Sequence, residues 1–308
     1  MSDAAFQNAM QEVAAAIEAL LPDLLPRPEG HTEALDGAML YACLGGGKRL
    51  RPLLTVAGAD LFGVKRSHSL RAAAAIEMLH CYSLAHDDLP CMDDDDLRRG
   101  RPTLHRAYDE ATAVLAGDGL QAQAFAVLAD PATHPEASVR LELVAALAQA
   151  AGPRGMVGGQ AIDLHAEALA GQGQRMTMAE ISRLQALKTG ALIGFAAEAG
   201  AILGQAPAPA RQALRAYAGA IGLAFQIADD ILDREGDAAT LGKRVGKDEA
   251  AGKATFVGLL GLEGARARAA ELVREAQGYL QQLPGDIGVS GDTEVLHGLA
   301  AFVITRRS

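Results

Sequence analysis

The sequence predicts an all-α fold, a single large bundle of about ten or more helices. Half of the 308 residues are hydrophobic and only 4% are aromatic, and much of the apolar content is Ala and Leu, which favour helices. Apolar residues recur at spacings of three and four through most of the chain. We find no alternating run of β-branched residues long enough for a strand. No linker, repeat or low-complexity tract divides the chain, so one domain over residues 1–308 is expected.

The N-terminal part of the chain predicts four helices separated by turns. Apolar spacing predicts an amphipathic helix over residues 3–20, and three prolines predict a loop over residues 21–30. Thr32 is a candidate N-cap for a helix that ends at Leu44, before three glycines. Two more apolar helices follow, one ending near Phe62 and one over residues 71–88.

The rest of the chain continues the helical pattern. Helices are predicted over residues 108–129 and 138–151, and a glycine-rich stretch over 152–159 leads into a short helix from Gln160. Thr177 and Glu180 form a capping-box signature for a helix that runs to about Leu203. The last helices are predicted over residues 209–233, 254–283 and 292–304, with polar sequence over residues 234–253.

Charge and composition exclude several classes of function. The net charge of −10 argues against nucleic acid and against anionic membranes as partners. Three cysteines without CxxC spacing predict reduced thiols in a cytoplasmic protein rather than a disulfide framework. Residues 1–6 lack the basic and apolar regions of a secretory leader. The apolar stretch over residues 190–204 is short for a membrane span and contains Glu198, so it predicts a core helix and no stable membrane insertion.

An acidic group follows the predicted helix over residues 71–88. Six carboxylates fall within the ten residues 87–96, and Arg98, Arg99 and Arg101 come directly after them. Ionised acids this close repel one another unless cations compensate them, and carboxylate oxygens suit Mg²⁺, which also bridges to phosphate. Guanidinium groups bind phosphate oxygens in pairs. The alternative is a solvated acidic loop.

The geometry of this first acidic group depends on Pro90. Asp87 and Asp93 are six residues apart and would lie on different faces of a straight helix. Because proline prevents a regular helix, an ended or bulged helix can bring Asp93 back beside Asp87. The three acids that follow, Asp94 to Asp96, are expected to be largely solvated.

A second acidic group ends the predicted helix over residues 209–233. Asp229 and Asp233 are four residues apart and share one helix face, with Asp230 beside them. The helix dipole opposes acids at a C-terminus, which favours a functional role over the alternative, an ordinary polar helix end.

Basic and polar residues accompany both acidic groups. Gly45 to Pro52 places a flexible backbone beside the three cations Lys48, Arg49 and Arg51, suited to an oxyanion, although a basic surface turn is an equal alternative. His80 lies two turns before Asp87; a lone histidine is more often a core residue than a ligand. The remaining candidates are Lys188, Thr189 and Gly190 inside a helix, Phe225 and Gln226 before the second acids, and Lys243 and Lys253 beyond them.

Five motifs in this order resemble those of the trans-polyprenyl diphosphate synthases. They are LGGGKRLRP at 44–52, HDDLPCMD at 86–93, GGQAID at 158–163, KTG at 188–190 and FQIADDILD at 225–233. The resemblance covers nearly the whole chain. It is strongest to the bacterial farnesyl diphosphate synthases, whose first aspartate motif has four residues, including a proline, between its acids.

The resemblance implies an all-α homodimer with a central cavity, Mg²⁺ at its mouth (three ions with substrate bound, Mn²⁺ as a possible substitute) and assigned residues. Asp87, Asp93 and Asp163 or Asp229 would coordinate Mg²⁺, with Asp88, Asp230 and Asp233 as further candidate ligands. Arg98, Lys188, Gln226 and Lys243 would contact the allylic diphosphate, with Thr189 near the reacting carbon. Lys48, Arg51, His80 and Arg99 would hold isopentenyl diphosphate, and Lys253 and Arg306–Arg307 would help to close the site.

The implied reaction condenses dimethylallyl or geranyl diphosphate with isopentenyl diphosphate to give (E,E)-farnesyl diphosphate, by ionisation, attack and loss of a proton to the released diphosphate. Tyr82, with Ser83 beside it, lies more than one turn behind the metal site; as the floor of the cavity it would stop growth at C15. The alternatives are a geranyl or geranylgeranyl diphosphate synthase, a class I terpene cyclase, which usually has more aromatics, and a non-catalytic regulatory subunit. Phe256–Val257 departs from the Tyr-Pro that relatives often carry.

Overall fold

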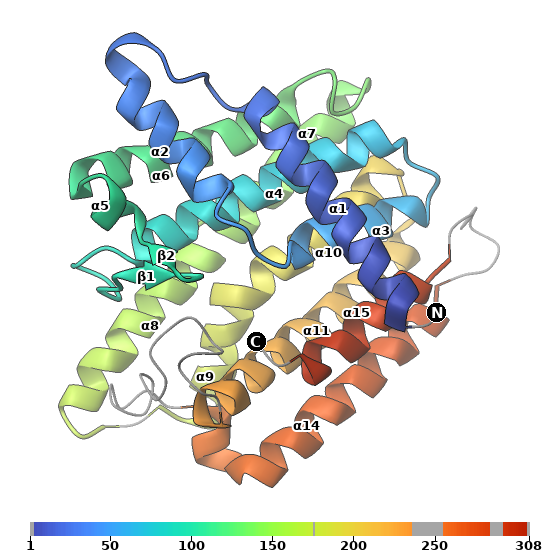
Figure 1. Ribbon diagram of the computed structural model, residues 1–308. Helices are drawn as coiled ribbons and strands as arrows, with labels where there is room; N and C mark the ends of the chain where they lie inside the picture. The colour runs from blue at the N-terminus through green and yellow to red at the C-terminus, as the bar shows by residue number, and fades with distance from the viewer. Residues whose placement is uncertain (1–2, 175, 236–254, 284–291, 307–308) are drawn as a thin grey trace.

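The computed structural model describes residues 3–174, 176–235, 255–283 and 292–306. Over these ranges all the regular elements are helices apart from one short hairpin (Figure 1), which confirms the predicted all-α class. The N-terminal half contains α1 (Asp3–Leu24), η1 (Gly30–Thr32), α2 (Glu33–Cys43), α3 (Leu50–Asp60), α4 (Arg66–Asp87), β1 (Leu97–Arg98), β2 (Arg101–Pro102), α5 (Leu104–Ala107), α6 (Glu110–Ala129) and α7 (Ala137–Ala151). The second half contains α8 (Met156–Gly171), α9 (Met178–Gln185), the π-helical η2 (Ala186–Gly190), α10 (Ala191–Leu203), α11 (Ala208–Glu235), α14 (Phe256–Gln281) and α15 (Glu294–Thr305).

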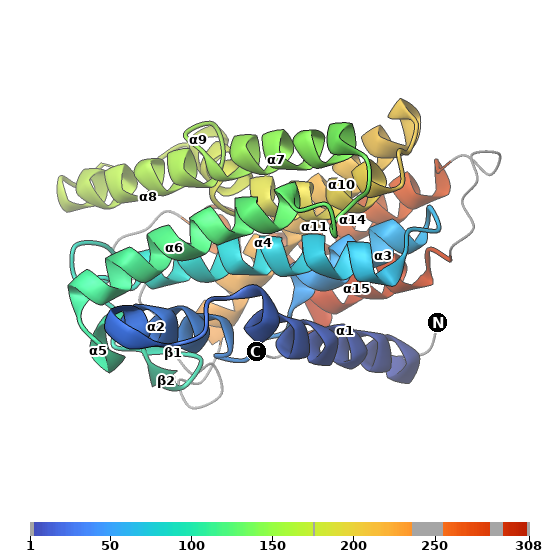
Figure 2. The ribbon, with the colours of Figure 1, turned by 90° about the horizontal axis from the view of Figure 1, so that it is seen from above.

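Helix α4 runs through the middle of the bundle and carries the first acidic group at its end. Its residues 72–76 and Leu79 are fully buried, and four of them are alanines, which let neighbouring helices approach closely. Helices α3 and α6 pack along α4, while α10 packs against α3, α7 and α11 (Figure 2). Helices α4 and α11 both run toward the side that carries the β1–β2 hairpin (Figure 1). Both acidic helix ends therefore lie on the same half of the molecule.

Two N-terminal predictions were wrong. Helix α1 continues through Pro22 to Leu24, where we expected a loop from residue 21. Burial of Leu21 and Leu25, which are 0% and 5% exposed, stabilises this last turn, and the Leu25 amide donates to the Leu21 carbonyl at 3.0 Å. Thr32 precedes α2 but does not cap it with its side chain; its hydroxyl donates to the Glu29 carbonyl oxygen instead.

The second half of the glycine-rich stretch over residues 152–159 is helical, which the sequence did not predict. Helix α8 begins at Met156 and extends for 16 residues. A Cβ atom on Gly159 would lie 2.2 Å from the Lys188 amide nitrogen. Gly159 therefore allows α8 to approach η2 closely, and its role is not chain flexibility. The KTG motif consequently packs against the GGQAID motif.

The β1–β2 hairpin is a second departure, because we predicted no strand. Each strand has two residues, paired antiparallel with Leu97 opposite Pro102. Strands this short leave no hydrophobic alternation for a pattern search to find. The capping box, by contrast, is confirmed: Thr177 and Glu180 exchange both hydrogen bonds at the start of α9.

The apolar segment Met178–Leu203 is long enough to cross a membrane by length and composition, and 56% of its most apolar window is buried inside the protein. In α10 the side chains of Leu192, Phe195 and Ile202 are all at most 3% exposed. This packing agrees with the predicted core helix.

Candidate active site

The glycine loop between α2 and α3 forms one wall of a cavity of about 470 Å³. All four residues that the resemblance assigned to isopentenyl diphosphate line this cavity. They are Lys48, Arg51, His80 and Arg99. The apolar side of the cavity comes from α10, α11 and α15, with Ile193, Ile221 and Val303 among its residues. The cavity can therefore hold an anionic head against its cations and a short apolar group against the opposite wall.

The loop takes this shape because of its glycines and of Arg99. Gly46 and Gly47 have φ values of +77° and +119°, a region that favours glycine. The Arg99 guanidinium lies directly on the loop: it donates to the Gly46 carbonyl, and a Cβ on Gly47 would be 2.6 Å from its Cζ. The hairpin that follows the first acidic group thus covers the loop, and Arg101 adds a hydrogen bond to the Leu44 carbonyl.

Arg49 anchors the loop from below, and sequence reasoning missed this role. The residue is 3% exposed and has a φ of +49°. Its guanidinium donates to the Cys43 carbonyl at 2.6 Å and to Glu77 Oε1 at 2.5 Å, and it lies 3.5 Å from Glu18. With Arg49 tied down, its neighbour Lys48 and, two residues on, Arg51 reach the cavity. The signal for this role was Glu77, because an acid in an alanine-rich buried stretch needs a charged partner.

Burial controls the charge of the groups at the bottom of this cavity. Burial lowers the pKa of the Arg51 guanidinium, and its Nε atom has no hydrogen-bond partner among the residues that the structure describes. Burial, together with the positive charge of Arg51, holds the pKa of His80 well below its usual range, so this imidazole is neutral at pH 7. An anionic ligand would offset the cost of burying the Arg51 charge and would accept a hydrogen bond from its Nε atom.

The first acidic group returns on itself as Pro90 predicted. Helix α4 ends at Asp87, and the Asp93 amide donates to the Asp87 carbonyl at 2.8 Å. Burial raises the pKa of Asp87 to about 6; Lys188 opposes the shift and Asp93 adds to it. The two carboxyl groups therefore act on each other across the turn, although they are six residues apart.

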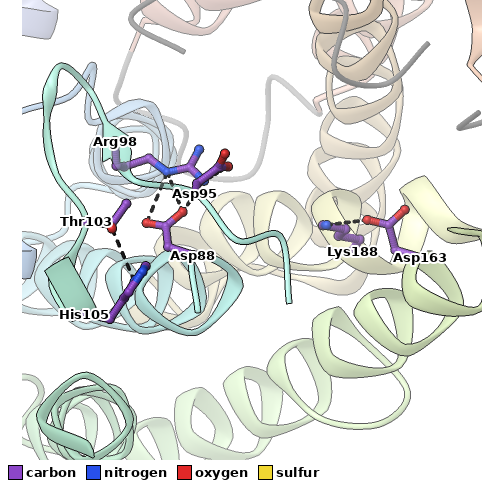
Figure 3. A network of polar contacts seen from close by, with 7 residues as sticks. All are labelled: Asp88, Asp95, Arg98, Thr103, His105, Asp163 and Lys188. Atoms are coloured by element: carbon purple, nitrogen blue, oxygen red, sulfur yellow. Dashed lines mark hydrogen bonds and ion pairs between the residues drawn. The ribbon is translucent and has the colours of Figure 1, made fainter. Parts of the chain in front are cut away.

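The Asp88 carboxylate points toward Arg98 (Figure 3). Arg98 Nε lies 3.0 Å from Asp88 Oδ1 and its Nη2 makes a second contact with the same carboxylate. Asp88 is 2% exposed, and Asp95 lies 3.5 Å from the same guanidinium. The buried pair fixes the start of the β1–β2 hairpin to the end of α4.

A second cavity of about 350 Å³ leads inward from Asp87. Its walls include Tyr82 and Ser83 from α4, Gln160 from α8, and Lys188 and Thr189 from η2. Arg51 and His80 line both this cavity and the first one. The two cavities are therefore adjacent, with a shared wall between the glycine loop and the acidic end of α4.

The π-helical turn η2 presents the KTG motif to the second cavity. Lys188 Nζ pairs with Asp163 Oδ2 of α8 at 2.6 Å (Figure 3). The extra residue of a π-turn locally changes which side chains face inward. Gln160 was missed: its side chain is 9% exposed, and both of its polar atoms have no hydrogen-bond partner among the described residues.

The second acidic group makes contacts with the C-terminal helices. Asp229 pairs with Arg306 at 2.6 Å, and the Arg306 guanidinium lies 3.8 Å from the centre of the Phe225 ring. Asp230 accepts the Phe256 amide at 2.7 Å, and Asp233 is 8% exposed. Gln226 is half-buried on α11 and lines neither of the two cavities described above.

Asp229 nevertheless belongs to the same charged region as the glycine loop. Its negative charge raises the pKa of Lys48 and of Arg51, against the larger lowering by burial. Three predicted site residues, Lys243, Lys253 and Arg307, lie outside the described residues, so their predictions stay untested.

The residues present fit a magnesium ion that is shared with a substrate. In the described parts of the chain, no three carboxylate, imidazole or thiol groups gather around one point. Mg²⁺ in phosphate-transfer sites is held by only one or two carboxylates together with phosphate oxygens, which matches the sparse set at Asp87 and Asp93. Burial raises the pKa of Asp87 in spite of Lys188 and Arg98, and a divalent cation would offset this cost of burying the ionised form.

We expect Mg²⁺ affinity to fall as pH drops through the pKa of Asp87. The folded pKa of about 6 lies above the unfolded value, so the metal-free fold loses stability as pH rises from the unfolded value to about 6 and stays less stable above it. The metal needs the ionised form, so its apparent affinity should fall about tenfold per pH unit below the pKa and level off above it. The rise in unfolding temperature with millimolar Mg²⁺ measures this effect. Asp87→Asn should lose the pH dependence; an unchanged dependence would assign it to another group.

Known proteins resemble this chain closely. A profile described as polyprenyl synthetase matches residues 32–283. The farnesyl diphosphate synthase of Escherichia coli is 47% identical over 294 residues, which cover 94% of this chain and 95% of that enzyme. An apo structure of an FPP/GFPP synthase from Zymomonas mobilis matches with a TM-score of 0.87 and 48% identity, covering 99% of this chain and 100% of that one. A geranyltransferase from Helicobacter pylori complexed with magnesium and isoprenyl diphosphate matches with a TM-score of 0.80 and 32% identity, covering 98% and 95%.

Proposed function

The chain belongs to the polyprenyl synthetase family, and from this premise we propose how its residues divide the work of the reaction. The reaction is that of a short-chain prenyltransferase, which condenses isopentenyl diphosphate with dimethylallyl or geranyl diphosphate to give (E,E)-farnesyl diphosphate. The comparisons confirm the resemblance drawn from the five motifs and the isoprenoid synthase type of fold.

Two adjacent cavities with different linings support one binding place for each of the two substrates. The first cavity has the cations Lys48, Arg51 and Arg99 with neutral His80, a set suited to a diphosphate that stays intact. The second has Asp87, Lys188 and Thr189 at its mouth, which suits a diphosphate that must leave. We assign isopentenyl diphosphate to the first cavity and the allylic diphosphate to the second.

The positive charge of Mg²⁺ fits the assignment of the leaving diphosphate to the second cavity. When bound, it neutralises the leaving diphosphate so that the allylic C–O bond can ionise. Asp87 and Asp93 would hold it on one side, and Asp163 or Asp229 on the other; we propose three ions in the substrate complex, with Mn²⁺ as a substitute. Because Asp88 is buried against Arg98, its part is to position that arginine rather than to ligate metal directly.

The protein's own groups then act on the substrates. Lys188 and Arg98 contact the departing diphosphate, and the Lys188–Asp163 pair orients the lysine. Gln160 and Thr189, whose side chains line the second cavity, face the reacting carbon with oxygen atoms that stabilise positive charge. Apolar walls such as Leu192 exclude water from the cation. The proton lost after attack goes to the released diphosphate.

Tyr82 sets the product length in this proposal, and Tyr82→Ala should lengthen the products. The ring is 8% exposed and lines the second cavity behind Asp87. Removing it opens space for further isoprene units, and we expect the ratio of C20 to C15 products to rise about tenfold, the scale of small changes in apolar pocket volume. Product chain length is read by chromatography, with Tyr108→Ala as a control tyrosine outside the cavity. C15 output that persists in Tyr82→Ala would remove Tyr82 from this role.

A homodimer and a cytoplasmic location complete the proposal. Leu115 of α6 and Leu141 of α7 are 55% and 69% exposed. Large apolar side chains that are exposed to this extent favour a second copy as their partner. Sedimentation of the wild-type chain and of a Leu115→Glu/Leu141→Glu variant tests this assignment.

One assay tests the function as a whole. The protein is incubated with Mg²⁺, labelled isopentenyl diphosphate and either dimethylallyl or geranyl diphosphate, and the products are separated by chain length. Farnesyl diphosphate as the main product supports the proposal. Products that stop at C10 or extend to C20 would support the geranyl or geranylgeranyl alternatives, and cyclic hydrocarbons or no turnover would support a cyclase or a regulatory subunit.

A further inference from the structure

Tyr82 is contacted by His86 of α4, which lines the same cavity, and lies beside Gln121 of α6. One turn later on α4, the His86 ring meets the Tyr82 ring edge-on, with centroids 5.0 Å apart and planes at 80°. This edge-to-face arrangement is a favourable one for aromatic rings. The Gln121 side chain of α6 lies near enough to the Tyr82 hydroxyl to lower its pKa, against the larger raising by burial. The position of the Tyr82 ring therefore depends on α6 as well as on α4.

His86 is itself fixed by α6. Its Nε2 atom lies 3.0 Å from the Val114 carbonyl oxygen; because a carbonyl can only accept, Nε2 carries the hydrogen. The imidazole then occupies the space that a side chain at position 117 would need. A Cβ on Gly117 would lie 2.1 Å from His86 Nε2 and 2.4 Å from its Cδ2. Only glycine at this position of α6 leaves room for the ring.

We propose that Gly117 and His86 are positioning residues that set the depth of the second cavity, and hence product length, by holding Tyr82 in place. The inference rests on the proposed prenyltransferase function and extends it to His86, which lines the second cavity, and to Gly117, which does not. Gly117 leaves space on α6, the His86 imidazole occupies that space, and the Tyr82 ring packs against the His86 ring. The chain of contacts runs from α6 to the floor of the cavity.

The two residues predict shifts of product length in opposite directions. Gly117→Ala adds a methyl group where His86 now lies, so the imidazole moves toward Tyr82 and pushes that ring into the cavity. The cavity becomes shallower and the ratio of C10 to C15 products rises. His86→Ala removes the support behind Tyr82, so the ring falls back and the ratio of C20 to C15 products rises. We expect each product ratio to change about tenfold, since one methylene of space in an apolar pocket changes the discrimination between two substrates by at least that factor.

The experiment measures the product ratios of the full-length enzyme and its variants under one set of conditions. Gly119→Ala is the matched control: it lies on the same helix, and its new Cβ meets only the flexible end of Met39, at 2.9 Å from Sδ. A double variant with Tyr82→Ala tests the route of the effect, because Gly117→Ala should change nothing once Tyr82 is gone. If Gly117→Ala folds poorly, His86→Ala, which leaves a gap rather than a clash, carries the test.

Opposite shifts in the two variants, with a wild-type ratio in Gly119→Ala, support the proposal. Wild-type ratios in both variants, or a shift in Gly119→Ala of the same size, overturn it. A Gly117→Ala effect that persists fully in the Tyr82→Ala background overturns the route through Tyr82. Total incorporation of labelled isopentenyl diphosphate by the wild-type enzyme reports separately on the function itself, and no incorporation would overturn both.

Discussion

Asp87→Asn should lower kcat/KM about 10³-fold with little change in the folded structure. The substitution keeps the shape of the side chain but removes a charged oxygen ligand for the cation that balances the leaving diphosphate. Metal-ion charge stabilisation of this kind is worth several kcal/mol, and each 1.4 kcal/mol corresponds to about tenfold in rate. Steady-state kinetics at saturating Mg²⁺, with circular dichroism as a check of the fold, measure the effect.

Asp94→Asn is the matched control, since it makes the same chemical change in the same loop. Asp94 is exposed and has a φ of +50°, a conformation that asparagine adopts as readily as aspartate. We expect its kcat/KM to stay within about twofold of wild type, the scale of ordinary surface changes. Equal losses in the two variants would mean that the loop needs negative charge in general and that Asp87 has no special place in it.

Arg49→Met should lower the free energy of unfolding by about 3–5 kcal/mol, the usual cost of removing one partner of a buried ion pair. Glu77 is 2% exposed, and the substitution would leave its carboxylate buried without the guanidinium that pairs with it at 2.5 Å. The Cys43 carbonyl would lose its donor at the same time. Urea unfolding followed by circular dichroism gives the change in midpoint and slope.

Two further variants distinguish the effect of losing the buried Arg49–Glu77 pair from the effect of losing any ion pair. Arg66→Met breaks an exposed pair with Asp60, at 3.5 Å and with side chains 44% and 52% exposed, and should change stability by less than about 0.5 kcal/mol. The double variant Arg49→Met/Glu77→Met replaces both buried charges and should recover most of the loss. If the double variant is no more stable than Arg49→Met alone, the loss comes from the loop conformation at Arg49 and not from an uncompensated charge.

The sequence predicted the helices and the polar residues of the site better than the way these parts are held together. Local signals were sufficient where one residue acts on its neighbours: Thr177 caps α9, and Pro90 ends α4 so that Asp93 returns to Asp87. Pro22 misled for the opposite reason, because burial of Leu21 outweighs the local preference of proline.

The missed features depend on contacts between distant segments. Gly159 reads as a flexible residue in the sequence, yet it is there so that η2 can approach α8. Arg49 belongs to a basic run whose members all line the first cavity, and its ion pair with the buried Glu77 distinguishes its role. Gln160 has no partner in the described residues, and such an absence cannot be read from a residue type. Packing between helices, not propensity, decided each of these.

The central claim is that the acidic ends of α4 and α11 act through shared metal ions on one diphosphate. A crystal structure of the full chain with Mg²⁺ and a bisphosphonate tests it most directly. We predict carboxylate oxygens of Asp87 and of Asp229 each within about 2.1 Å of an ion, the usual Mg²⁺–oxygen distance, and both ions bound to oxygens of the same bisphosphonate. A bisphosphonate held at Asp87 alone, with Asp229 still paired to Arg306 and no metal beside it, would contradict the account.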